Sequence, residues 1–195
     1  SCRNTFKAIA AKGRITIVDV AAPRMLMAHG FLRQIFEVFD RHRCPVDMVS
    51  TSEVSVSLTV DSNHAIPAIA QDLGKLADVK FTGRKAIVCL VGENLRNTPG
   101  VAASVFNALG DVNVRMISQG ASEINISFVI DEEGLLKPWD YQAFFQLITG
   151  QSIAGRMLIL SNAPGGEVAS ARISVAAVRR VIRFIEPPEV RVEAP

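Results

Sequence analysis

The sequence has few cysteines and no long apolar runs, and both absences limit the kind of protein it can be. Its three cysteines, Cys2, Cys44 and Cys89, lie far apart and form no CxxC or CxxH pair. Neither a disulfide framework nor a structural zinc site is therefore indicated, and Cys89, inside an apolar run, is expected in the core. No apolar stretch reaches the length of a membrane span and no secretory signal is recognisable, so we expect a cytoplasmic protein without a membrane partner.

The sequence also lacks the short motifs that mark common catalytic sites. No P-loop, GxSxG elbow or HExxH motif is present, and the three histidines, His29, His42 and His64, have no metal-ligand spacing. Acidic and basic residues are interspersed with a net charge of +2, which gives no electrostatic footprint for nucleic acid. We therefore expect no catalytic residue, metal or cofactor in this chain, and no nucleic-acid partner.

What the sequence does contain is an internal repeat at a spacing of 70 residues. Each copy has an apolar run, a polar loop, a glycine that opens a helical pattern, and two further apolar runs separated by a turn. The matching positions include Gly30 and Gly100, Ser52-Glu53 and Ser122-Glu123, and Asp61 and Asp131. A repeat of this length indicates one small folding module used twice.

The first copy predicts the order β-α-β-β-α-β. Two amphipathic helical patterns alternate with runs of β-branched and apolar residues, some of which show the period of two that is typical of half-buried strands. The predicted strands are residues 15–20, 46–50, 54–60 and 79–81, and the predicted helices are residues 30–40 and 63–77. This is the ferredoxin-like order, an antiparallel sheet covered on one face by two helices.

The second copy lacks one strand unless the N-terminal segment supplies it. Its predicted elements are strands at 86–91, 112–118 and 124–130 and a helix at 100–109. Residues 6–11 form a further strand, ended by a predicted turn at 12–14, that has no role in the first copy. The prediction is an α+β fold of two ferredoxin-like modules, the first (15–83) inserted in the second (5–14 and 84–195). A C-terminal extension with an atypical part at 132–172 contains helical patterns at 139–148 and 174–185.

The candidate binding site is the loop and helix start around Gly30. A glycine at a helix N-terminus lets a ligand approach free backbone N–H groups, which favour a carboxylate. Asp47 and Glu53, at the two ends of the next strand, are acids that could face an ammonium group. Amides at one end and carboxylates at the other suit a zwitterionic amino acid, while the alternative is a surface turn with solvated acids.

These residues also carry a resemblance to a known family. The segments R-M-L-M-A-H-G-F-L (24–32) and V-D-M-V-S-T-S-E-V-S-V-S-L (46–58) resemble the regulatory region of aspartate kinases. In the second copy, N-T-P-G-V-A (97–102) and V-R-M-I-S-Q-G-A-S-E-I-N-I-S-F (114–128) are similar to the second half of that region. The resemblance spans about residues 5–131, which is two-thirds of the chain.

The resemblance implies a tandem pair of ACT domains and allosteric feedback control of aspartate-family amino-acid biosynthesis. The effector would be an end-product amino acid, lysine or threonine, bound between paired ACT domains of a homodimer. Carried over position by position, it implies an effector site at Met25, Gly30, Phe31, Leu32, Val46, Asp47, Ser52 and Glu53. The implied partner is an aspartate kinase catalytic domain, which would use ATP and Mg and which is expected to be absent from this chain.

Two departures from the family pattern bear on the choice of effector. Ala28 and Pro45 stand where a lysine-binding member has serines, so both lysine and threonine stay open. Two alternatives of other classes also stay open. One is a stand-alone amino-acid-binding ACT protein, and the other is a purely structural dimerisation module.

Overall fold

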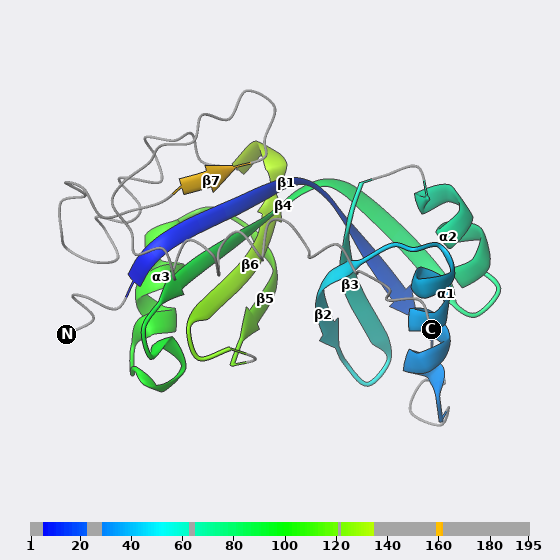
Figure 1. Cartoon of the computed structure of the whole chain (residues 1–195), viewed down its shortest axis with the longest axis horizontal. Helices are drawn as coiled ribbons and strands as arrows, with labels where there is room; N and C mark the ends of the chain where they lie inside the picture. Colours follow the sequence, from blue (N-terminus) through cyan, green and yellow to red (C-terminus); the bar gives the residue numbers. More distant parts are fainter. Residues whose placement is uncertain (1–5, 23–28, 63–64, 121, 135–158, 162–195) are drawn as a thin grey trace, which may run out of the picture.

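The structure is a computed structural model that describes residues 6–22, 29–62, 65–120, 122–134 and 159–161. Its strands form one sheet in the order β2-β3-β1-β4-β6-β5, with β7 paired to β1 outside this path. β1 (Phe6–Ala21) and β4 (Asp78–Gly92) are long strands that run side by side through both halves of the molecule. In Figure 1 they form an arch, with a group of shorter strands below each end.

The pairing of these two long strands joins two ferredoxin-like modules. Residues 15–21 of β1 lie between β3 and residues 78–82 of β4, which gives the first module the strand order β2-β3-β1-β4. Residues 6–12 of β1 pair with the second half of β4, which pairs in turn with β6. The N-terminal strand therefore completes the second sheet, as the sequence predicts.

The predicted turn at residues 12–14 is wrong, because β1 continues through it, and the predicted strands at 79–81 and 86–91 are parts of the single strand β4. The register between β1 and β4 shifts between Lys12 and Ile15, and Arg14 and Arg84 have φ values of 56° and 55°. These irregularities are 70 residues apart, at the place where each strand passes from one module to the other. A local bulge bends a strand without ending it, and that bend produces the arch.

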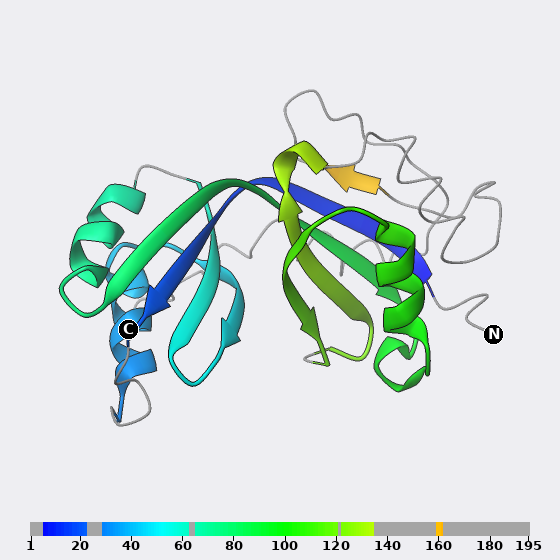
Figure 2. The same ribbon diagram turned by 180° about the vertical axis from the view of Figure 1, so that it is seen from behind.

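The first module has two helices on the outer face of its sheet. After β1, the helix α1 (Phe31–Arg41) leads into β2 (Val46–Thr51) and β3 (Ser55–Asp61), and α2 (Ile66–Leu73) precedes β4. Figure 2 shows both helices on the side of this sheet that faces away from the second module. The core between sheet and helices is formed by aliphatic and aromatic side chains such as Val18, Leu58, Ile35 and Phe39.

The second module repeats this arrangement with α3 (Val101–Leu109), β5 (Val114–Gln119) and β6 (Asn125–Asp131). Short helical turns, η2 (Leu95–Asn97) and η3 (Glu132–Gly134), flank these elements, and β7 (Ile159–Ser161) pairs in parallel with β1. Cys89 is 1% exposed, and this burial raises the pKa of its thiol to about 11, which confirms the expected core cysteine. The helices expected at 139–148 and 174–185 lie outside the described residues.

The inner faces of the two sheets meet in a third apolar cluster. It contains Ile15 and Ile17 of β1, Ile87 of β4 and Val129 of β6, together with one methionine from each of β2 and β5. The two methionines, Met48 and Met116, are 6% and 7% exposed although both strands are at the edges of the sheet. The modules therefore share a core and are not independent units on a flexible linker.

Candidate functional site

The first part of the candidate site is the N-terminus of α1. Gly30 precedes the helix with φ of 80°, a left-handed conformation that disfavours residues with a Cβ, and Gly100 has the same φ before α3. No side chain caps either helix, and the carbonyl oxygen of Gly30 accepts the N–H of Gln34 at 3.1 Å. The first-turn amides of α1 have no partner within the helix and are oriented to bind an anion.

The predicted site residues next to Gly30 have different environments. Phe31 is 8% exposed and packs in the first module's core, whereas Leu32 is 41% exposed on the outer surface of α1. Phe31 therefore fixes the start of the helix, and Leu32 is accessible to a ligand or to a second copy of the chain. Met25, which was also predicted, lies outside the described residues.

The hairpin between β2 and β3 lies at the same end of the first module. The hydroxyl oxygen of Ser52 accepts the N–H of Ser55 at 3.1 Å, which holds a tight turn with Glu53 exposed at its tip. The N–H of Ala22, just after β1, donates to the carbonyl oxygen of Val54 at 3.0 Å. Figure 1 shows the start of α1 at the same end of the first module as the β2–β3 hairpin.

Asp47 lies at the opposite end of β2, in an ion cluster. The ammonium group of Lys12 is 3.1 Å from Oδ2 of Asp47 and 2.8 Å from Oδ1 of Asp61, which ends β3. The side chain of Lys12 is 4% exposed and that of Asp47 is 19% exposed, whereas Asp61 is 49% exposed. One buried ammonium group therefore pairs with two carboxylates where β1 passes between the modules, so the three side chains together carry one excess negative charge.

The ionisation of this cluster reflects its composition. Burial alone lowers the pKa of Lys12, but the two carboxylates outweigh that effect and hold the pKa above its ordinary value. Burial raises the pKa of Asp47, and Lys12 offsets that rise only in part; the second carboxylate, Asp61, adds a smaller rise. A second cation nearby would therefore stabilise the charged form of Asp47.

The predicted residues do not all meet within one copy of the chain. Asp47 is the second residue of β2, Thr51 is the last, and Glu53 lies beyond that end in the hairpin. The four-residue separation along the strand is about 13 Å at the rise of a β-strand. Gly30, Leu32, Ser52 and Glu53 are therefore grouped at one end of the strand, and Val46 and Asp47 at the other. A single small amino acid bound to one chain contacts one group or the other.

Lys12 is the residue at this site that the sequence analysis missed. It lies in a segment that was interpreted as a turn, and a lone lysine beside a glycine carries no signal of burial. The second module has a related cluster, in which Lys85 and Arg115 both bind Asp131. Arg115 takes the place of Asp47: Asp47 precedes the inward-facing Met48 of β2, and Arg115 precedes the inward-facing Met116 of β5. The second module therefore cannot form the same acidic site.

Neither a metal cluster nor a membrane-spanning helix is found in the described part of the chain. Among those residues, no group of three or more His, Cys, Asp or Glu side chains could hold a metal ion. None of the helices in the same residues is long and apolar enough to cross a membrane.

Sequence comparison matches the chain to the ACT domain family at residues 18–71 and 88–137, two segments whose starts are 70 residues apart. The aspartokinase of Candida albicans is 38% identical over 141 residues, which cover 69% of this chain and 26% of that protein. Aspartokinase 1, chloroplastic, of Arabidopsis thaliana is 35% identical over 158 residues, covering 74% of this chain and 27% of that protein. The chain thus spans about a quarter of the length of these relatives.

Solved structures give the same result. A structure assigned as a C-terminal regulatory domain of aspartate kinase from Porphyromonas gingivalis W83 is 36% identical with a TM-score of 0.62. The match covers 77% of this chain and 99% of that one. E. coli aspartokinase III in complex with lysine and aspartate is 32% identical with a TM-score of 0.60, covering 75% of this chain and 32% of that one. The chain belongs to the ACT domain family, as a tandem pair of ACT domains of the aspartate kinase regulatory type.

Proposed function

We propose that the chain senses lysine or threonine and so controls an aspartate kinase catalytic domain. The observation that carries the proposal is a helix start at Gly30 without a side-chain cap, in a module that also presents Asp47 on β2 and Glu53 in the hairpin. Amides bind the carboxylate that every free amino acid has, and an acid binds an ammonium group. The proposed domain division assigns residues 15–83 to the first ACT domain and residues 5–14 and 84–195 to the second.

The proposed site lies between two copies of the chain. β2 is an edge strand, and edge strands present unpaired N–H and C=O groups that a symmetric partner can bind. When two such strands pair antiparallel about a two-fold axis, the start of one lies beside the end of the other. Asp47 of the partner subunit would then lie close to the start of α1 and to the β2–β3 hairpin, at the opposite end of β2 from Asp47 of the same chain.

Exposed apolar side chains support this mode of dimerisation. In the first module, Leu32 and Phe36 on α1 are 41% and 40% exposed, and Val49 and Val54 on β2 and its hairpin are 42% and 49% exposed. A side-by-side dimer of first modules would cover residues of this kind, and apolar area removed from water stabilises association. We therefore expect a homodimer whose affinity rises when the effector is bound.

The choice between the two effectors depends on what contacts Asp47. Lysine carries a second ammonium group, which would take over part of the role of Lys12 toward Asp47. Threonine carries a hydroxyl group and would leave the pair between Lys12 and Asp47 intact. Lysine is preferred because the one ammonium group of Lys12 serves two carboxylates, Asp47 and Asp61, so a further cation beside Asp47 is favourable.

Calorimetric titration of the purified chain with lysine, threonine and methionine tests the proposed function. We expect lysine or threonine to bind at one molecule per chain, methionine to bind far more weakly, and sedimentation to show a dimer at tens of micromolar. A dimer that binds none of the three amino acids would instead favour a structural dimerisation module. Binding without any effect on a kinase catalytic domain would favour a stand-alone amino-acid-binding protein.

A cytoplasmic location also stays a prediction, since relatives include chloroplastic enzymes.

Substitution of the glycine before α1 separates a binding role from a folding role. Gly30→Ala and Gly100→Ala place a Cβ on residues with the same φ of 80°, so each should lower the free energy of unfolding by about 1–2 kcal/mol. Only Gly30→Ala should also weaken amino-acid binding, because the strain tilts the first-turn amides of α1. Urea unfolding and calorimetry on both variants check this, and equal loss of binding in the two would remove Gly30 from the site.

A further inference from the structure

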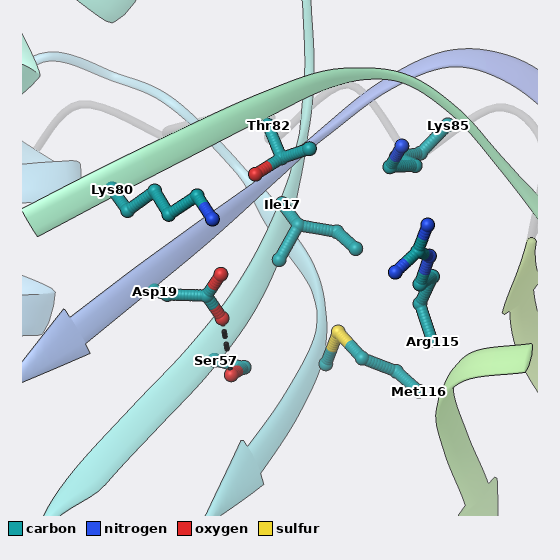
Figure 3. Close-up of a pocket in the computed structure, with 8 residues that line it drawn as sticks. All are labelled: Ile17, Asp19, Ser57, Lys80, Thr82, Lys85, Arg115 and Met116. Atoms are coloured by element: carbon teal, nitrogen blue, oxygen red, sulfur yellow. Dashed lines mark hydrogen bonds between the residues drawn. The ribbon is translucent and has the colours of Figure 1, made fainter. Parts of the chain in front are cut away.

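A cavity of about 320 Å³ lies between the modules, on the inner faces of the two sheets. The first module contributes Asp19, Ser57 and Lys80 among others, and the second contributes Lys85 and Arg115. Figure 3 shows these side chains converging from β1, β3, β4 and β5 around a centre formed by Ile17 and Thr82. The volume is at the small end of the range for ligand-binding pockets.

The polar lining of this cavity is predominantly cationic. At one end, Lys85 and Arg115 both bind Asp131, and the Arg115 guanidinium is 3.0 Å from Oδ2. These two cations hold the pKa of Asp131 below its ordinary value, so Asp131 stays charged and neutralises one of them. At the other end, Lys80 makes no ion pair with any residue of the described chain. The carboxylate of Asp19 there is held by the hydroxyl of Ser57 at 2.6 Å.

The repeat shows that the fold does not require these charges. Asp19 of β1 is the register partner of Lys80 of β4. In the repeat, Asp19 corresponds to Cys89 and Lys80 to Ala10, and these two residues are also register partners. Cys89 and Ala10 are 1% and 0% exposed, so the second module has an apolar, buried surface at the same place. Ser57 recurs as Ser127, opposite Cys89. Asp19 and Lys80 are therefore features of this cavity, and the ACT sheet does not require them.

We propose that this inter-module cavity binds a small dicarboxylate anion. One carboxylate group contacts Arg115 and Lys85, the other contacts Lys80, and the carbon chain between them lies on Ile17 and Met116 (Figure 3). Two carboxylates match the two cationic ends of the cavity, and charge-assisted contacts of this type are strong. The three cations exceed the carboxylates of Asp19 and Asp131 by one positive charge. This site is separate from the proposed effector site, which uses Gly30, Glu53 and Asp47.

Occupation of the cavity would link the two modules. Lys80 belongs to the half of β4 in the first module, and Lys85 to the half in the second, on either side of the irregularity at Arg84. A ligand that contacts both halves fixes their relative placement at the point where the strand bends. A dicarboxylate should therefore raise the melting temperature of the whole chain.

Calorimetry at physiological ionic strength with glutarate and butyrate tests the proposal. Glutarate should bind at one molecule per chain, and butyrate, which has one carboxylate, should bind at least about tenfold more weakly. Arg115→Gln and Lys80→Gln should each weaken glutarate binding by about tenfold or more. Both side chains are at the surface, so the variants are expected to fold, and thermal unfolding verifies this.

Two charge-matched variants and the amino acids are the controls. Arg96→Gln and Lys7→Gln each remove an exposed cation remote from the cavity and should leave glutarate binding unchanged. Glutarate that binds no better than butyrate, or equally well to Arg115→Gln and Arg96→Gln, would overturn the proposal. Lysine and threonine binding should not change in Arg115→Gln, so failure of this site is distinguishable from failure of the effector site.

Discussion

Replacement of Lys12 by methionine is expected to lower the free energy of unfolding by about 3 kcal/mol near pH 7. The substitution removes the ammonium group that pairs with Asp47 and Asp61 and leaves the mostly buried Asp47 carboxylate without its cation. The loss is at the low end for a broken buried ion pair because Asp61 is half exposed. Urea unfolding measures it directly, and Lys7→Met, which removes an exposed cation 3.9 Å from Glu93, should cost at most about 0.5 kcal/mol.

The pH dependence of this loss has a definite sign. The pKa of Lys12 is raised by folding, so its contribution is complete below its unfolded pKa of about 10.5 and is lost only as the pH rises through its folded pKa. In Lys12→Met, Asp47 no longer has the attraction that opposes burial, so its folded pKa rises further above its unfolded value. The deficit should therefore be greatest near pH 7 and shrink as the pH falls through that raised pKa toward about pH 4. A deficit independent of pH would show that lost packing, not charge, is its cause.

Asp47→Ala is expected to weaken effector binding by about ten- to a hundredfold, because a charge-assisted contact contributes roughly 1.5–3 kcal/mol. The effect should be greater for lysine than for threonine if a side-chain ammonium contacts this carboxylate. Calorimetric titration of the variant with both amino acids measures it. Unchanged affinity would remove Asp47 from the site.

Asp61→Ala is the matched control for this substitution. It also takes one carboxylate from Lys12, but Asp61 ends β3 and is not among the predicted effector residues. The two variants disturb the same ion cluster, so a loss of binding in Asp47→Ala alone identifies a contact with the ligand. A similar loss in both would instead show that the cluster acts through the conformation of β1.

Periodicity and the repeat were enough to predict most of the fold. The alternation in residues 54–60 and the helical spacing after Gly30 predicted β3 and α1, because each pattern follows from one buried face. The missing strand of the second copy predicted the role of residues 6–11. The turn at 12–14 was predicted wrongly, since a glycine beside a charged residue marks a bulge as well as a turn.

The candidate site was less predictable, because its contacts are made between distant segments. The resemblance supplied Gly30, Asp47 and Glu53, but residue types alone did not show that Asp47 and the hairpin with Glu53 lie at opposite ends of β2. Nor did they show that Lys12 is buried beside Asp47, since only the crossover of β1 brings them together. The inter-module cavity likewise depends on the bend of the arch, which no local pattern encodes.

A mixture of two weakened variants tests most directly whether two copies share the effector site. Asp47→Ala and Gly30→Ala homodimers should each bind the effector weakly, so they are mixed in equal amounts, allowed to exchange subunits and titrated by calorimetry. In a mixed dimer, one site combines an intact Gly30 with Asp47 of the partner subunit, so about a quarter of all sites should regain the wild-type affinity. If the site lay within one chain, the mixture would show no high-affinity sites at all.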